Sequence, residues 1–163
     1  MPLSATDLLF LKQCEAVKKE SHDPDRQVGV IIANSVGHIL ATGSNKPPIA
    51  LGLTVRDSHS AIASDPEWKY FVLEHAERNA INNARDLGRS VKGATMYSTL
   101  FPCADCARAI SAAGIGRLVA ALPEADALRD EKWQQHFRYA RQILELSGVQ
   151  LDLAPLKTKP EPD

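Results

Sequence analysis

Apolar positions along the chain follow two periods, one typical of helices and one typical of buried strands. Near the N-terminus, helical spacing joins Phe10, Leu11, Cys14 and Val17. Together with the polar start Ser4-Ala5-Thr6-Asp7, this stripe predicts a helix that ends near Glu20. Residues 28–33 are continuously apolar and rich in β-branched side chains, which predicts a strand buried on both faces. Turn residues at 34–37 and a second strand at 36–42 would complete a hairpin.

The second half of the chain alternates helix and strand signals. Helical patterns cover 75–85, 103–114 and 126–146, and strand patterns cover 94–99, 117–122 and 149–153. A helix between two neighbouring strands makes those strands parallel. We therefore expect an α/β fold: a three-layer α/β/α sandwich around a five-stranded mixed sheet, with an antiparallel hairpin plus parallel strands. In the last helix, Trp133, Phe137, Ala140 and Leu144 predict a core-facing stripe rather than a base-stacking surface.

Two segments lack a clear period. Residues 43–66 contain three prolines and two glycines, and we expect this long loop to form the rim of the active site. Residues 154–163 are rich in Pro and Lys and predict a flexible C-terminal tail. The remaining residues, 1–153, are expected to form a single domain, since that length suits one hydrophobic core.

Two short motifs carry the candidate chemistry: His75-Ala76-Glu77 and Pro102-Cys103-Ala104-Asp105-Cys106. One imidazole and two thiolates supply three protein ligands, one fewer than tetrahedral zinc takes, and an open fourth position is typical of a catalytic zinc. Cys103 and Cys106 lie one turn apart at a predicted helix start, where the helix dipole favours thiolates. Glu77 is placed to move protons without binding the metal. We expect Zn²⁺ held by His75, Cys103 and Cys106, with Glu77 as the catalytic residue.

Each motif alone has other interpretations. A Cys-x-x-Cys pair can be a redox pair or half of a structural zinc module, and His-x-Glu is common by chance. Together, however, the two motifs match the H-x-E and P-C-x-x-C signature of nucleobase deaminases. The alternatives to an active deaminase are a structural zinc module and an inactive binding module with this fold. The presence of Glu77 argues against both, because a purely structural zinc site needs no acid–base carboxylate.

The composition of the chain narrows the classes of molecule that it can bind. With 19 basic and 20 acidic residues among 163, the formal charge is −1, which argues against a nucleic-acid polymer and favours a small-molecule partner. The apolar runs are too short to span a membrane and the N-terminus lacks a signal-peptide pattern. Three cysteines, two of them assigned to metal, suit a reducing compartment. We therefore expect a cytoplasmic protein with no membrane partner.

From about Ser21 to Val149 the chain resembles the deoxycytidylate (dCMP) deaminases of the cytidine deaminase superfamily. The resemblance is carried by Asp23-Pro24, Gln27-Val28-Gly29, Asn45-x-x-Pro48, His75-Ala76-Glu77 with Asn79-Ala80-Ile81, Met96-Tyr97, Leu100-Phe101-Pro102-Cys103 and Ala113-Gly114-Ile115. In its predicted parallel fifth strand the chain resembles the dCMP and tRNA-adenosine deaminase branches of this superfamily. The compact cytidine deaminases instead end their sheet with an antiparallel strand. One departure is Gly43-Ser44-Asn45-Lys46, where that family usually has Gly-Tyr-Asn-Gly.

The resemblance implies conversion of dCMP to dUMP with release of ammonia, in a homo-oligomer. It also implies that His75, Cys103 and Cys106 bind zinc and that Glu77 shuttles protons. Asn45 would bind the substrate sugar, and the backbone N–H of Ala76 and the carbonyl of Phe101 would bind the pyrimidine.

The sequence leaves the substrate open. A dCMP deaminase needs a cation for the phosphate, for which Arg26 is the first candidate and Lys46 and Arg56 are the others. A deaminase of a free base, nucleoside or other aminated heterocycle, of cytosine, cytidine, guanine or adenine type, would not need that cation. A tRNA adenosine deaminase would need a basic face, which this composition does not suggest.

Overall fold

A five-stranded sheet forms the centre of the computed structural model, which describes residues 2–122 and 131–155. Its strands are β1 (Gly29–Ala33), β2 (Ile39–Ser44), β3 (Thr95–Ser98), β4 (Arg117–Ala121) and β5 (Gln150–Ala154), in the order β2-β1-β3-β4-β5. Strand β1 is antiparallel to both of its neighbours, whereas β3, β4 and β5 are parallel. The predicted mixed sheet, with a hairpin followed by parallel strands, is confirmed.

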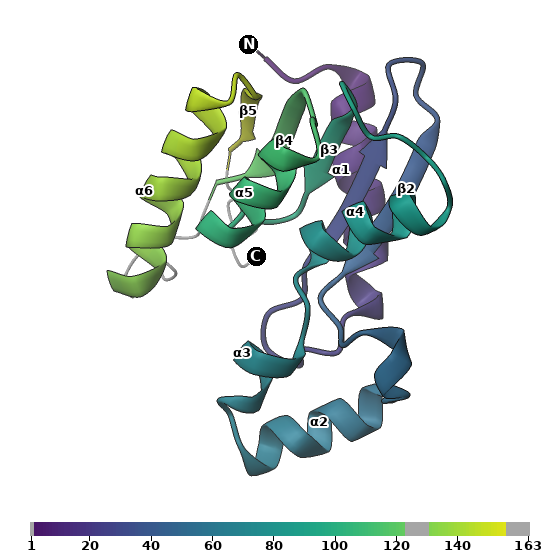
Figure 1. The fold of residues 1–163 in the computed structure, drawn as a ribbon, viewed down its shortest axis with the longest axis vertical. Coiled ribbons are helices and arrows are strands. Elements are labelled where there is room, and N and C mark those ends of the chain that lie inside the picture. The colour runs from purple at the N-terminus through teal and green to yellow at the C-terminus, as the bar shows by residue number, and fades with distance from the viewer. Residues whose placement is uncertain (1, 123–130, 156–163) are drawn as a thin grey trace, which may run out of the picture.

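Helices cover both faces of this sheet (Figure 1). They are α1 (Ala5–Val17), α2 (Val55–Ser64), α3 (Trp68–Val72), α4 (Ala76–Asp86), α5 (Ala104–Ala112) and α6 (Glu131–Leu146), with short 3₁₀ turns at Lys18–Glu20 and Ile49–Leu51. Helix α1 packs on one face through Phe10 and Cys14. Helices α4, α5 and α6 pack on the other face over the larger core. The structure is therefore the predicted three-layer sandwich, and within the described residues no helix is long and apolar enough to cross a membrane.

Two glycines let helices approach the sheet closely. A Cβ atom at Gly29 would lie 2.2 Å from the carbonyl oxygen of Cys14, and one at Gly43 would lie 2.4 Å from the carbonyl oxygen of Ala76. Only glycine therefore fits where α1 crosses β1 and where α4 crosses β2. The contact at Gly43 sets the position of the first turn of α4, the turn that carries Glu77.

The N-termini of α4 and α5 lie at the same edge of the sheet. Helix α4 starts beside the end of β2, where the side-chain amide of Asn79 donates to the carbonyl oxygen of Ser44 at 2.8 Å. Helix α5 starts shortly after the end of β3, with Cys103 as its N-cap. Because β2 and β3 each run antiparallel to β1, their carboxyl ends share one edge. His75 and Cys103, the N-caps of the two helices, are thereby brought together.

The structure corrects three of the predicted boundaries. The segment 43–66 is not an irregular loop, since it contains α2, which begins with a capping box formed by Thr54 and Asp57. Strand β2 starts at Ile39 rather than 36, because the side chain of Asn34 accepts from the backbone N–H groups of Val36 and His38 and extends the turn. Strand β5 includes Ala154, which had been assigned to the tail. The predicted start of the last helix at 126–130 and tail residues 156–163 lie outside the described residues.

Candidate active site and metal centre

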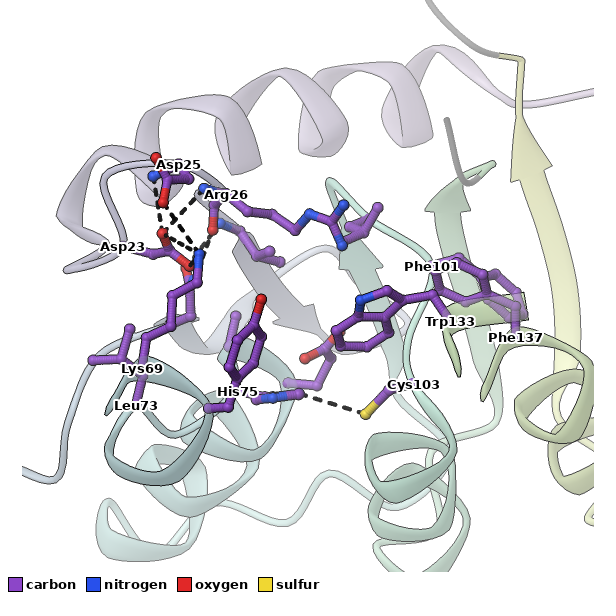
Figure 2. A pocket seen from close by; sticks show the side chains of 16 residues that line it. Asp23, Asp25, Arg26, Lys69, Leu73, His75, Phe101, Cys103, Trp133 and Phe137 are labelled. Carbon is purple, nitrogen blue, oxygen red and sulfur yellow. Dashed lines mark hydrogen bonds and ion pairs between the residues drawn. The ribbon is translucent and has the colours of Figure 1, made fainter. Parts of the chain in front are cut away.

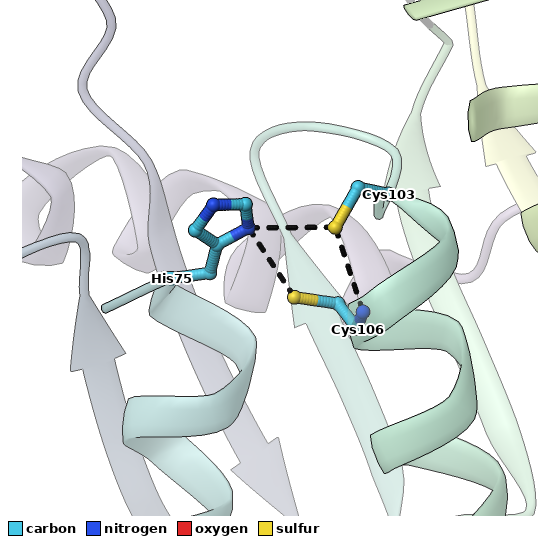
Figure 3. Close-up of side chains that lie close together, drawn as sticks. All are labelled: His75, Cys103 and Cys106. Carbon is cyan, nitrogen blue, oxygen red and sulfur yellow. Dashed lines mark hydrogen bonds between the residues drawn. The ribbon is translucent and has the colours of Figure 1, made fainter. Parts of the chain in front are cut away.

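Three ligand-type side chains meet where α4 and α5 begin (Figure 3). The Nδ1 atom of His75 lies 3.4 Å from Sγ of Cys103 and 3.5 Å from Sγ of Cys106. All three ligand atoms are within 4.8 Å of one another. The structure therefore assembles the three predicted metal ligands at one point.

The spacing of these atoms fits zinc. Zn–S bonds of about 2.3 Å and Zn–N bonds of about 2.1 Å at a tetrahedral angle would place the nitrogen and sulfur atoms about 3.6 Å apart. The observed distances of 3.4 and 3.5 Å are close to this value. A site of one imidazole and two thiols also matches the N/S ligand preference of zinc and leaves one coordination position for water or substrate.

Neighbouring groups set the orientation and charge of the ligands. The side chain of Glu74 accepts from the backbone N–H of His75 at 2.8 Å and pairs with Arg78, which fixes the start of α4. A hydrogen bond with Cys106 lowers the pKa of Cys103 to about 4, while the same interaction raises the pKa of Cys106. The hydrogen bond with Cys103 raises the pKa of His75. These shifts favour the thiolate at Cys103, and zinc ligation requires the deprotonated forms of Cys106 and His75 as well.

Glu77 lies next to the ligand cluster without belonging to it. Its side chain is buried, with the residue 5% exposed, and Oε2 accepts from Sγ of Cys106 at 3.3 Å. Burial raises the pKa of this carboxyl, so it takes up a proton more readily than an exposed glutamate. A buried carboxyl with a raised pKa beside a metal site is suited to accept a proton and return it.

A pocket of about 390 Å³ opens over the cluster (Figure 2). It is lined by Asp23, Asp25, Arg26, Val28, Asn45, Lys69, Tyr70, Leu73, His75, Ala76, Glu77, Leu100, Phe101, Cys103, Trp133 and Phe137. Arg26, Asn45, Ala76 and Phe101 therefore share one cavity with Glu77 and with two of the three ligands, His75 and Cys103. Lys46 and Arg56 are not among the lining residues, and Lys46 pairs instead with Glu20 at 3.8 Å.

Asn45 connects the wall of this pocket to the loop before β1. Its Oδ1 accepts from the backbone N–H of Val28 at 2.9 Å, and its Nδ2 donates to the carbonyl oxygen of Arg26 at 2.8 Å. The amide keeps one further lone pair and one further proton available for a ligand. Ala76 is the first residue of α4, where backbone N–H groups have no acceptor within the helix, so its N–H is available to a ligand as well.

Several lining residues were not anticipated from the sequence. Trp133 and Phe137 of α6 belong to the core stripe, as predicted, but they also line the pocket. They reach it because α6 packs on the loop after β3, where the rings of Phe101 and Phe137 are 6.0 Å apart. Lys69 and Tyr70 come from α3, a helix that had no clear periodic signal in the sequence.

His136 of α6 also takes part in shaping the site. Its Nδ1 accepts from the backbone N–H of Ala104, in the first turn of α5, at 3.2 Å. This hydrogen bond ties α6 to the loop that carries Cys103. No local sequence pattern distinguishes such a residue, because the contact joins segments 32 residues apart.

Comparison with known proteins agrees with this site. Residues 4–122 match the family model for the cytidine and deoxycytidylate deaminase zinc-binding region. An uncharacterized deaminase encoded in the luxG 3′ region of Aliivibrio fischeri is 31% identical over 147 residues, which cover 90% of this chain and 92% of that protein. Human deoxycytidylate deaminase is 38% identical over 101 residues, 62% of this chain, and the match spans only 56% of the human protein.

Among solved structures, the dCMP deaminase of cyanophage S-TIM5 in complex with dCMP and dUMP superposes with a TM-score of 0.71 at 21% identity, covering 94% of this chain and all of that one. At this identity the likeness establishes the fold. The family model covers most of the chain and includes the three ligands and Glu77. The chain therefore belongs to the cytidine and deoxycytidylate deaminase family, whose shared element is the zinc-binding region.

Proposed function

We propose that this protein is a zinc-dependent hydrolase that deaminates dCMP to dUMP and releases ammonia. The observation that carries the proposal is the position of buried Glu77 beside a three-ligand N/S site at the base of a ligand-sized pocket. The human relative is a deoxycytidylate deaminase, and the phage structure of the same fold was obtained with dCMP and dUMP. Both support dCMP as the substrate.

The residues divide the chemistry between them. Zinc bound by His75, Cys103 and Cys106 would supply a water of lowered pKa. The carboxylate of Glu77 would accept a proton from the attacking water as the water oxygen adds to the ring carbon that bears the amino group. The same carboxyl would then return this proton to the amino group, which would leave as ammonia. The raised pKa of Glu77 suits both steps, since the group must hold the proton between them.

Other lining residues would orient the nucleotide. The backbone N–H of Ala76 and the carbonyl of Phe101 would bind the pyrimidine, and the Asn45 amide would bind the sugar. Arg26, whose guanidinium carbon lies 5.6 Å from the centre of the Trp133 ring, is the candidate for the phosphate. A guanidinium held against an aromatic ring loses less freedom on binding an anion, which favours this role.

One observation favours a second candidate, a deaminase of an uncharged base or nucleoside. Among the described lining residues outside the metal cluster and Glu77, the cations Arg26 and Lys69 are balanced by Asp23 and Asp25. A rim without net charge offers less attraction to a phosphate than a basic rim would.

A substrate panel tests the proposal. The protein is offered dCMP, CMP, deoxycytidine, cytosine, adenine and guanine, and ammonia release is measured. We expect kcat/KM for dCMP to exceed that for deoxycytidine by about 10- to 100-fold, the value of a charge-assisted phosphate contact. Arg26→Ala should remove most of that preference, with Arg56→Ala as a control. Turnover of deoxycytidine or a free base in preference to dCMP would favour the second candidate.

We also propose a homo-oligomer in a reducing compartment such as the cytoplasm. Large apolar side chains are exposed in residues 49–72: Ile49, in the 3₁₀ turn, is 86% exposed, and Phe71, in α3, is 84% exposed. Contact with a second copy would cover them. The three cysteines are free thiols, as zinc ligation in a reducing compartment requires. We treat residues 1–153 as one deaminase domain. Light scattering of the purified protein would test the oligomer.

A further inference from the structure

An ion-pair cluster lines one side of the pocket, beside the backbone of Arg26 (Figure 2). The ammonium nitrogen of Lys69, on α3, is 3.2 Å from the carboxylate of Asp23 and 3.3 Å from that of Asp25. All of these side chains line the pocket that holds His75 and Glu77. They are therefore charged groups in the same cavity as the candidate metal centre.

Asp23 is a fixed part of this rim. Its side chain is buried, and its Oδ1 accepts from the backbone N–H groups of Asp25 and Arg26 at 2.9 and 3.2 Å. Asp23 therefore holds both the ammonium group of Lys69 and the backbone of Arg26. This carboxylate therefore fixes the ammonium group of Lys69 and the backbone from which the Arg26 side chain extends, while the Arg26 guanidinium reaches towards Trp133 (Figure 2).

Asp25 differs from Asp23 in its surroundings. Its side chain is 72% exposed, whereas that of Lys69 is 13% exposed. An ion pair with a solvent-exposed carboxylate is weak, because water and salt screen it. The contact between Asp25 and Lys69 is therefore one that a stronger anion can replace, while the contact between Asp23 and Lys69 is kept.

We propose that Lys69 is a second phosphate-contacting residue and that Asp25 occupies its ammonium group until the phosphate of the substrate displaces it. The proposal rests on the proposed function, since it requires an anionic nucleotide. With Asp25 in place the rim carries no net charge; with Asp25 displaced, Arg26 and Lys69 outweigh Asp23 by one positive charge. A dianionic phosphate competes better for an ammonium group than a single carboxylate does. Replacement of Asp25 by the phosphate at Lys69 makes the affinity for a nucleotide depend on its phosphate rather than on its pyrimidine ring.

Asp25→Asn is the sharpest test, because the residue is exposed and its replacement leaves the Lys69–Asp23 pair intact. Removing the competing charge should lower KM for dCMP by about three- to tenfold at low salt and leave KM for deoxycytidine unchanged. Asp86→Asn, which removes an exposed carboxylate paired with Arg85 away from the pocket, is the control and should change neither value. Binding of dUMP, measured by calorimetry, should tighten in parallel.

Lys69 is tested with two substitutions. Lys69→Arg keeps the charge and should retain most of the affinity for dCMP. Lys69→Gln keeps a hydrogen-bond donor for Asp23 but loses the charge, and should raise KM for dCMP about tenfold with deoxycytidine unaffected. Circular dichroism establishes that each variant is folded before it is compared.

The outcomes separate this inference from the function on which it rests. If the wild type deaminates dCMP but Asp25→Asn raises its KM, or shifts dCMP and deoxycytidine equally, the inference is wrong and the function stands. Equal KM values for dCMP in wild type and Asp25→Asn would also overturn the inference. If the wild type does not deaminate dCMP, both fail together.

Discussion

Two carboxyl groups are buried on opposite sides of the sheet, and their pKa values shift in opposite directions. Glu77 of α4 is 5% exposed and Asp7 of α1 is 3% exposed. Burial raises the pKa of Glu77, whereas hydrogen bonds from Arg117 hold the pKa of Asp7 below its usual range. Similar burial thus gives one carboxyl that readily accepts a proton and one that remains ionised.

The difference lies in their partners. Asp7 receives two hydrogen bonds from the guanidinium of Arg117, at 2.7 and 3.0 Å, one from the hydroxyl of Tyr97 at 3.1 Å and one from the backbone N–H of Ser4 at 2.9 Å. Arg117 also donates to Asp152, so α1, β3, β4 and β5 are joined by one network. Glu77 has a thiol at 3.3 Å and lies beside a metal cluster.

The comparison shows how one fold keeps a structural carboxylate and a reactive one apart. A buried charge is stabilising only when it is paired and hydrogen-bonded, as Asp7 is. Leaving a carboxyl without such a cation raises its pKa towards the range that acid–base catalysis needs. At the candidate active site, therefore, a buried carboxyl lacks the paired cation that stabilises Asp7.

The largest expected effect comes from removing the proton-accepting group. Glu77→Gln keeps the size of the side chain but cannot take up and return a proton, so kcat should fall by about 10³-fold or more. Zinc content and the unfolding midpoint should not decrease, because the ligands remain and a buried acid is removed. Glu67→Gln, an exposed glutamate, is the control. Turnover within tenfold of wild type would show that Glu77 is not the proton shuttle.

Cysteine substitutions test whether Glu77 lies beside a metal site. Cys106 and Cys14 are both fully buried, but only Cys106 belongs to the ligand cluster. Cys106→Ser should weaken zinc binding by more than about 100-fold, the upper range for losing a residue that merely supports a ligand. Cys14→Ser should keep one zinc per chain, although it places a hydroxyl in the core. Equal zinc content in both variants would contradict the assignment of Cys106.

Asp7→Asn should affect stability rather than chemistry. It leaves Arg117 facing an amide, and we expect a loss of about 3 kcal/mol in the free energy of unfolding at pH 7, with kcat unchanged well below the unfolding temperature. The folded-state pKa of Asp7 is lower than its ordinary value of 3.8, so its contribution is complete above pH 3.8 and is lost as pH falls through the folded value.

Denaturant titrations of wild type and Asp7→Asn at several pH values check this. The difference between the two should shrink as pH falls below about 3.8. Asp57→Asn is the matched control, because Asp57 closes the same kind of capping box at α2 but is exposed and lacks the Arg117 contacts. A similar loss of stability in the control would assign the effect to helix capping instead of the ion pair.

The metal centre was predictable from sequence because each half of it is local. His75 and Glu77 are two residues apart, and Cys103 and Cys106 are one helical turn apart, so each pair has the same geometry wherever its helix starts. The sheet and most helices were predictable for the same reason, since their signals are periodic within short windows. Helices α2 and α3 were the exceptions: prolines and glycines masked a capping box at Thr54 and Asp57 in α2, and α3 has only five residues, too few to show a helical period.

The rim of the pocket was not predictable in this way. Arg26, Lys69 and Trp133 come from three segments, and their proximity depends on how α3 and α6 pack. Position near the expected rim suggested Arg26, Lys46 and Arg56 as phosphate contacts, and of these Arg26 lines the pocket whereas Lys46 and Arg56 do not. Likewise nothing local pairs Asp7 with Arg117, 110 residues away.

The smallest expected effect concerns the single hydroxyl that Asp7 receives from Tyr97. Tyr97→Phe keeps the ring stacked on Phe10, where the centroids are 4.8 Å apart, and removes one hydrogen bond of 3.1 Å. Since Asp7 keeps both hydrogen bonds from Arg117, we expect a loss of only about 1 kcal/mol in the free energy of unfolding. The raised pKa of Tyr97, about 12 because of burial, keeps this hydroxyl protonated, so the loss should be constant from pH 6 to pH 9, about the neutral range. Denaturant titration at both limits checks it, and a loss as large as that of Asp7→Asn would mean that Tyr97, not Arg117, is the main partner of this carboxylate.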